Sequence, residues 1–256
     1  MTKKAWISLT AVVGAIALTL SSNASTLQDI RRAGEIRLGN SADYEPFYFK
    51  QSGKLTGFEV ELGNALAARL GVKPNWRQVA FDSLLVTVDQ GRLDAAIASH
   101  TITAVRARIV DFANPHYCTG TVIVSRAGGP NDPTQLVGKS VSATQSSTFA
   151  TFARSISGVK QVMTFKQEQE ALDALRQGKV DAYITDRLAA VAYAKKYPTP
   201  KLQISALLTT ERIAIAVKKG NTSLLNAINE SLTALYTDGT YAKLSQKYFG
   251  ADIRCQ

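Results

Sequence analysis

Hydrophobic and polar positions switch between helical and strand spacing along the chain, and one combination of the two occurs twice. The ten residues before Gly91 and the ten before Gly178 carry apolar side chains at the spacing of an amphipathic helix. A glycine directly after such a stretch typically ends the helix. Short apolar stretches, 95–99 and 182–184, follow the two glycines and are typical of strands. The repeat predicts two copies of one α/β unit and therefore two similar lobes.

The same patterns predict an α/β protein in which helices and strands alternate through both halves of the chain. Strands are expected at 35–39, 76–79, 95–99, 121–125, 140–143, 160–165, 182–184 and 212–217, and a hairpin at 47–50 and 55–58. Helices are expected at 59–70, 81–90, 147–155, 171–177, 187–196, 223–237 and 241–248.

The strands 121–125 and 212–217 bracket the second copy of the repeat, so we expect them to cross between the lobes as a hinge. The first lobe then comprises residues 25–120 and 213–256, and the second comprises residues 121–212. Two modest lobes suit a mature chain of roughly 230 residues better than one small core does. Strands of two lobes that end facing each other form a cleft, and such clefts bind ligands.

The first 24 residues have the parts of a secretory signal peptide. Lys3 and Lys4 form the basic start, residues 5–20 form an apolar run, and small residues precede a cleavage point after Ala24. The apolar run is short for a membrane span, although a retained N-terminal anchor is the alternative. We therefore expect cleavage after Ala24 and export to the periplasm.

The distribution of basic residues argues against nucleic acid as a partner. The formal net charge is +10, or +10 − 2 = +8 without the two lysines of the signal peptide, but basic residues cluster only in pairs. Nucleic-acid binding would require a basic stripe with interleaved aromatic residues, so we do not expect it.

The two cysteines, Cys118 and Cys255, are expected to form a disulfide, because an even pair in an oxidising compartment is usually joined. Two free thiols are the alternative. The two histidines, His100 and His116, do not lie at a metal-ligand spacing from the cysteines, so we expect no metal site and no cofactor.

The segment after the first copy of the repeat carries a candidate carboxylate clamp. On an extended segment Ser99 and Thr101 point to one side, and Arg106 follows near a helix start. Two hydroxyls, free backbone N–H groups and a guanidinium together can bind a carboxylate, with the arginine bidentate. The alternative is a surface Arg106 with hydroxyls that cap a helix.

The second lobe offers complementary groups. Ser147 and Thr148 lie where a loop enters a helix, and backbone N–H groups at such a point bind anions. Asp186 ends the second repeat strand, where it can accept a hydrogen bond from an ammonium group or cap the next helix. Tyr44 and Phe81 are candidate aromatic walls, with core packing as the alternative.

A set of short segments, each weak alone and specific together, carries a family resemblance: 42–47, 57–62, 94–106, 111–112, 138–141, 180–182 and 238–241. The chain resembles the periplasmic solute-binding proteins of the polar amino-acid ABC-transporter type, the family of the histidine, lysine-arginine-ornithine and glutamine binders. The resemblance covers nearly all of the mature chain. It implies the type II periplasmic-binding-protein fold, in which two α/β lobes joined by two hinge strands close over one ligand.

The resemblance also implies roles for the first-lobe residues of the ligand site. Tyr44 and Phe81 would hold the aliphatic part of an amino acid between them. Ser99 and Thr101 would bind its α-ammonium and α-carboxylate groups through backbone and hydroxyl groups, and Ala98 would contribute only its backbone.

The remaining site residues would form a clamp across the cleft. Arg106 would pair with the ligand carboxylate, helped by the backbone N–H of Thr148 beside Ser147. Asp186 would hold the α-ammonium group from the opposite lobe, so that closure depends on contacts with both lobes.

Two positions depart from relatives with charged pockets. Ser41 stands where relatives often carry aspartate, and Thr144 stands where the glutamine binder carries lysine. The side-chain end of the pocket is therefore expected to lack charge, and a charged ligand end would lose its hydration there at a cost of several kcal/mol. We expect a neutral or polar amino acid, with His100 pointing away from it.

The expected function is capture of an amino acid and its delivery to an inner-membrane ABC permease by a monomeric binding protein that is not an enzyme. A periplasmic enzyme similar to cyclohexadienyl or arogenate dehydratase is the alternative on the same fold, but the sequence shows no spare cleft carboxyl group for it. A sensor that feeds a receptor is a third possibility.

Overall fold

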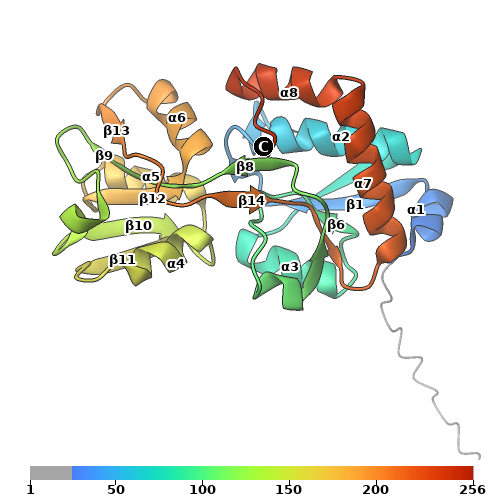
Figure 1. Ribbon diagram of the computed structural model, residues 1–256, viewed down its shortest axis with the longest axis horizontal. Helices are drawn as coiled ribbons and strands as arrows, with labels where there is room; N and C mark the ends of the chain where they lie inside the picture. The colour runs from blue at the N-terminus through green and yellow to red at the C-terminus, as the bar shows by residue number, and fades with distance from the viewer. Residues whose placement is uncertain (1–24, 256) are drawn as a thin grey trace, which may run out of the picture.

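The computed structural model describes residues 25–255, so the expected signal peptide lies outside the described residues. Figure 1 shows two lobes side by side, each built around a five-stranded sheet. The first lobe holds α1 (Leu27–Ala33), β1 (Glu35–Asn40), β2 (Asp43–Tyr44), β3 (Tyr48–Gln51), β4 (Lys54–Thr56), α2 (Phe58–Leu70), β5 (Lys73–Gln78), α3 (Phe81–Asp89), β6 (Ala95–Ala96), the 3₁₀ helix η1 (Arg106–Arg108), β7 (Val110–Phe112), β15 (Ala216–Lys218), α7 (Thr222–Thr237) and α8 (Thr240–Phe249).

The second lobe holds β9 (Thr121–Arg126), η2 (Pro133–Leu136), β10 (Ser140–Thr144), α4 (Thr148–Ser155), β11 (Gln161–Phe165), α5 (Glu168–Arg176), β12 (Ala182–Asp186), α6 (Arg187–Lys196) and β13 (Leu202–Ile204). Between the lobes lie β8 (Tyr117–Thr119) and β14 (Glu211–Ile213). The two-lobed α/β fold is confirmed.

Both sheets have the same internal plan, which explains the repeat in the sequence. The strand order is β5-β1-β6-β15-β7 in the first lobe and β11-β10-β12-β9-β13 in the second. In each sheet three parallel strands come first, and an antiparallel strand lies beside the third. The repeated units are α3 with β6 and α5 with β12, so both copies supply the third strand of their sheet.

Helix α2 illustrates how the apolar pattern becomes core. Phe58, Leu62, Leu66 and Leu70 recur at four-residue intervals and are all buried. They face the sheet and the helices α7 and α8, which pack against α2. Gly71 ends the helix in the left-handed conformation, with φ of 77°.

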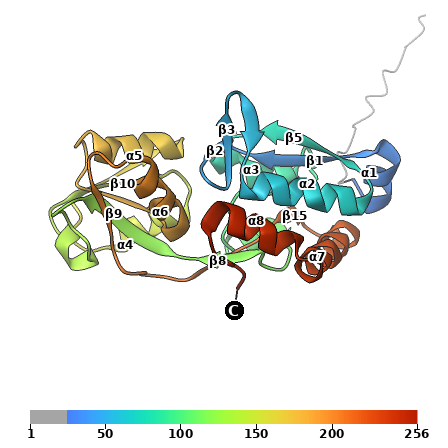
Figure 2. The same cartoon turned by 90° about the horizontal axis from the view of Figure 1, so that it is seen from above.

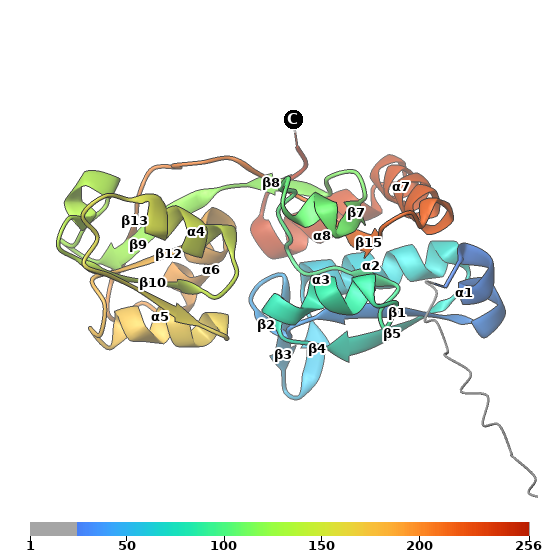
Figure 3. The same ribbon diagram turned by 90° about the horizontal axis from the view of Figure 1, so that it is seen from below.

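The hinge lies slightly away from its expected place. The antiparallel pair that connects the lobes is β8 with β14, whereas 121–126 belong to the second sheet and 216–218 to the first. Figures 2 and 3 show the two connecting segments together along one side of the molecule. Gly120 lies in the first segment where the second segment approaches it closely. A Cβ atom at this position would lie 1.7 Å from the carbonyl oxygen of Thr209 on the second segment, so only glycine fits.

The disulfide between Cys118 and Cys255 is present. It ties the C-terminal segment to the hinge strand β8, and its partners are separated by 137 positions in the sequence. Within residues 25–255 no helix is long and apolar enough to cross a membrane.

Other expected elements changed in extent. The strand 95–99 is only two residues long, the helix expected at 171–177 begins at Glu168, and the strand 212–217 is divided into β14 and β15. Short strands such as β7 and β13 were not predicted, because three residues are too few to show a period.

Candidate functional site

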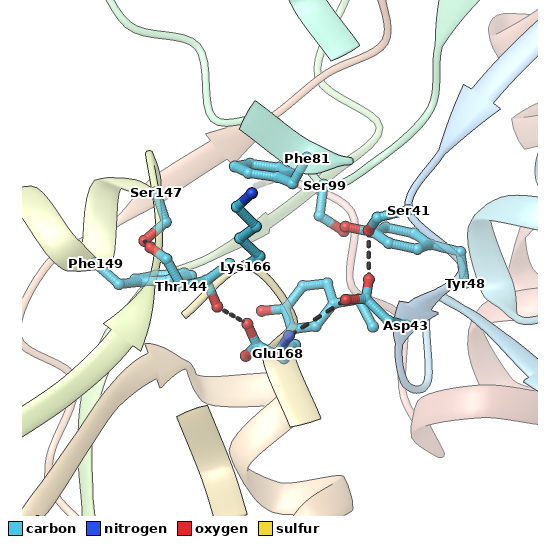
Figure 4. A pocket seen from close by; sticks show the side chains of 11 residues that line it. Ser41, Asp43, Tyr48, Phe81, Ser99, Thr144, Ser147, Phe149, Lys166 and Glu168 are labelled. Atoms are coloured by element: carbon cyan, nitrogen blue, oxygen red, sulfur yellow. Dashed lines mark hydrogen bonds between the residues drawn. The ribbon is translucent and has the colours of Figure 1, made fainter. Parts of the chain in front are cut away.

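A cavity lies between the lobes. Figure 4 shows side chains from both lobes around it. The first lobe contributes Ser41, Asp43, Tyr44, Tyr48, Phe81 and Ser99, and the second contributes Thr144, Ser147, Phe149, Lys166 and Glu168.

Ser99 lines the cavity in a conformation that the sequence did not reveal. Its φ is +53°, so it is not extended as expected but left-handed, which costs a non-glycine residue roughly 1–2 kcal/mol. Buried Glu59 on α2 stabilises this conformation, because its carboxylate accepts hydrogen bonds from the Ser99 backbone N–H (3.1 Å) and hydroxyl (2.9 Å). The ring nitrogen Nε2 of buried His116 lies 2.7 Å from the same carboxylate.

Arg106 begins η1 and reaches both lobes. Its guanidinium donates to the carbonyl oxygen of Thr101 (3.0 Å) and to that of Ser146 in the second lobe (3.2 Å). It lies over the Phe81 ring, 5.6 Å from the centroid, and forms no ion pair with any residue in 25–255. Desolvation lowers the pKa of Arg106 from its usual value, so an anion that pairs with this cation would relieve the cost.

Phe81 lines the cavity as expected, and His100 lies behind it. The two rings stack with their centroids 4.6 Å apart. His100 is buried and does not line the cavity, which agrees with its expected position away from the ligand. Burial lowers the pKa of His100 well below its usual value, so this ring is neutral at pH 7.

The loop that enters α4 faces the first lobe. Ser147 lines the cavity and caps α4, accepting from the backbone N–H of Ala150 at 3.0 Å. The hydroxyls of Thr148 and Thr101 lie 3.5 Å apart across the cleft. Thr101 also donates to the buried carboxylate of Glu211 (2.7 Å).

Asp186 lies at the end of β12 and caps α6. One of its oxygens accepts from the backbone N–H groups of Leu188 (2.6 Å) and Ala189 (3.1 Å). The capping role and an ammonium contact remain compatible, because a carboxylate has a second oxygen. Burial raises the pKa of Asp186 to about 7, and nearby Glu211 adds to the shift. Asp186 and Ala98 are both buried and do not line the cavity surface.

Tyr44 lines the cavity with its hydroxyl oxygen buried and without a hydrogen-bond partner among the described residues. Its pKa is raised well above the usual value, first by burial and then by the negative charges of Asp186 and Glu168. Its ring stacks on Phe47 with the centroids 5.2 Å apart.

The expectation of an uncharged side-chain end is wrong, because Asp43, Lys166 and Glu168 all line the cavity. Lys166 and Glu168 follow the carboxyl end of β11, which is the edge of a sheet where α/β proteins bind ligands. That position was a usable signal in the sequence. The half-buried Asp43, beside Tyr44 in the first lobe, had no comparable signal.

Asp43 and Glu168 are in contact across the cleft. The backbone N–H of Glu168 donates to Asp43 at 3.3 Å, and the Glu168 carboxyl group accepts from the hydroxyls of Thr144 and Thr185. Burial raises the pKa of Glu168 to about 8, and the nearby Asp43 charge adds to the shift. Burial also raises the pKa of Asp43. The sequence-based view that the cleft has no carboxyl group with a raised pKa is therefore wrong.

Further contacts join the lobes around the cavity. Lys196 of α6 forms an ion pair with Glu45 of the first lobe, and Gln145 donates to Asp82 at 3.3 Å. Together with the contacts that Arg106 and Glu168 make across the cleft, these bonds hold the two lobes against each other around the cavity.

Known proteins are similar to this chain in sequence and in fold. A model of the family described as bacterial extracellular solute-binding proteins, family 3, matches residues 36–251. The L-cystine-binding protein TcyJ of Escherichia coli (strain K12) is 31% identical over 250 residues, which cover 95% of this chain and 93% of that protein.

Two solved structures are also similar over most of the chain. An ancestral arginine-binding protein bound to glutamine has a TM-score of 0.82 at 36% identity and covers 85% of this chain and 99% of its own. The ancestral amino acid-binding protein AncCDT-1, a precursor of cyclohexadienyl dehydratase, has a TM-score of 0.82 at 32% identity, covering 87% and 99%.

Proposed function

This chain belongs to the bacterial extracellular solute-binding proteins of family 3, and we propose that it captures an α-amino acid of zero net charge in the cavity between its lobes. Its relatives are substrate-binding components of amino-acid ABC importers. The amino acid would pass from the closed protein to an inner-membrane permease. Export of a monomer to the periplasm, after cleavage of residues 1–24, completes the proposal.

The observation that carries the proposal is the composition of the cavity wall, which both lobes build. A ligand that touches Phe81 in the first lobe and Ser147 in the second stabilises the closed arrangement more than the open one. Closure is then a population shift driven by differential contacts. Release to a permease requires only that the same contacts be weakened.

The head of an amino acid finds a partner for each of its charges. Arg106 is half-buried and forms no ion pair within 25–255, so it would bind the carboxylate, with Ser99 and the start of α4 donating further hydrogen bonds. Asp186 would accept from the ammonium group through the oxygen that does not cap α6. Tyr44 would contact the aliphatic part opposite Phe81.

Arg106→Ala tests the proposal. Truncating one partner of a buried, hydrogen-bonded charge pair typically costs about 2–5 kcal/mol, so affinity for the best amino-acid ligand should fall at least ~30-fold by titration calorimetry. Arg108→Ala, which removes an exposed arginine from the same short helix, is the matched control and should bind normally. Equal binding by both variants and the wild-type protein would contradict the assignment.

An enzyme is the second candidate function, and Glu168 is the observation that favours it. A carboxyl group with a pKa of about 8 is protonated at pH 7 and suits a general acid. The hydroxyls of Thr144 and Thr185 both contact this group, which supports a fixed binding role instead. Assays of prephenate and L-arogenate turnover discriminate the two functions.

A further inference from the structure

The amino-acid head accounts for only part of the charge around the cavity. With Arg106 and Asp186 assigned to the head, Asp43, Glu168 and Lys166 are left over. All three line the cavity, and none forms an ion pair with another described residue. The cavity therefore holds a second set of charges of both signs.

Asp43 and Glu168 form the acidic part of this set. They come from opposite lobes and are joined by the hydrogen bond from the Glu168 backbone N–H to Asp43. The negative charge of Asp43 adds to the raised pKa of Glu168, because like charges repel at short range. With its pKa raised to about 8, Glu168 carries a proton at pH 7.

Lys166 forms the basic part. Its side chain lines the cavity, is exposed and has no hydrogen bond or ion pair with a described residue. In Figure 4 its ammonium end points toward Phe81, away from Glu168. The two carboxyl groups and the lysine thus lie at separate points of the same cavity.

The hydroxyl of Tyr44 is an independent indication that a ligand group belongs here. It belongs to a side chain that lines the cavity, it is buried, and it lacks a partner within residues 25–255. Buried polar groups are almost always hydrogen-bonded, so an unpaired one beside a cavity indicates a missing partner. A polar group of a ligand in this cavity can supply that partner.

We propose, on the basis of the function proposed above, that the cavity binds an amino acid with two zwitterionic heads, one at each end of an aliphatic or disulfide-linked chain. The second ammonium group lies between Asp43 and Glu168, and the second carboxylate pairs with Lys166. Such a ligand has no net charge, and its second ammonium group bridges the two lobes directly.

Ligands whose side chain ends in a single charged group match Asp43, Glu168 and Lys166 less well than a ligand with a second ammonium and a second carboxylate group. Lysine and arginine would satisfy Asp43 and Glu168 but would place a cation in a cavity that already holds Lys166. Glutamate would satisfy Lys166 but would place a carboxylate near two acidic groups. Specificity here rests on these repulsive contacts as well as on the attractive ones.

Titration calorimetry of the mature protein against L-cystine, L-cystathionine, meso-diaminopimelate, L-lysine, L-arginine, L-glutamate and L-glutamine tests the proposal. At least one two-headed compound should bind tenfold or more tightly than every single-headed one. A single-headed amino acid that binds as tightly as any two-headed one overturns the inference but leaves the proposed function standing. If none of the compounds binds, the inference fails, and the proposed function fails as well if none of the other α-amino acids of zero net charge binds.

Lys166→Met tests the second head separately, and the exposed position of Lys166 makes the substitution compatible with folding. Affinity for the two-headed ligand should fall tenfold or more, whereas affinity for L-lysine should stay the same or rise. Lys160→Met, which removes another exposed lysine of the second lobe, is the matched control. Unchanged affinity of Lys166→Met for the two-headed ligand would overturn the inference.

Discussion

Replacing Glu59 by glutamine tests how the protein positions Ser99. The Glu59 carboxylate makes three contacts, two with Ser99 and one with His116; Glu59 and His116 are buried, and Ser99 is half-buried. Hydrogen bonds to charged groups contribute about 1.5–3 kcal/mol each, against about 0.5–1.5 for neutral ones. An amide at position 59 therefore weakens each contact by roughly 1 kcal/mol, and the expected loss of folding stability is about 3 kcal/mol.

The same substitution should reduce ligand affinity, because Ser99 would no longer be fixed in its left-handed conformation. Urea unfolding and titration calorimetry measure the two effects. Glu61→Gln is the matched control, since Glu61 lies two positions along α2 but bonds only to Lys247 and Tyr248 near the surface. A Glu59→Gln protein within 1 kcal/mol of the wild type, with unchanged affinity, would refute this account of Ser99.

Three further predictions concern stability and proton binding. The Cys118→Ala/Cys255→Ala protein should lose about 5 kcal/mol in urea unfolding, because the disulfide closes a loop of 137 positions; a loss below about 2 kcal/mol would contradict this. The folded state binds more protons than the unfolded state between pH 4.5 and 8 at Glu168, so stability should fall as pH rises through that window. Thermal melts should show a weaker pH dependence in Glu168→Gln, and an unchanged profile would contradict the assignment. Binding of a two-headed ligand near pH 7.5 should release protons, because the ammonium group of the ligand lowers the pKa of Glu168. Calorimetry in buffers of different ionisation enthalpy measures this release. Proton uptake on binding would contradict the prediction.

Sequence patterns anticipated the elements whose signals are local. The helix over 187–196 and the strand over 121–125 agree with the structure to within one residue, because apolar spacing and glycine positions act over a single turn or strand. The hinge was misplaced by a few residues. Its position depends on the close approach of Gly120 to Thr209, which lie 89 positions apart, and no local pattern encodes such a contact.

The site residues also differ in whether their signals in the sequence are local. Ser99 and Ser147 were predicted from their places at the end of a strand and the start of a helix, and Phe81 was predicted as an aromatic wall; the structure places all three on the cavity wall. Glu59 was missed because its partners, Ser99 and His116, are 40 and 57 positions away. Their contact exists only after α2 packs on the first sheet.

The sequence by itself determined the repeat, the alternation of helices and strands, the family and the pairing of two cysteines, because each depends on local spacing, on composition or on short motifs. Only the tertiary structure decided the charge of the cavity. Asp43 and Glu168 lie 125 positions apart and meet because two lobes close on each other. Their raised pKa values come from the exclusion of water at that contact, and exclusion of water is a property of packing rather than of sequence.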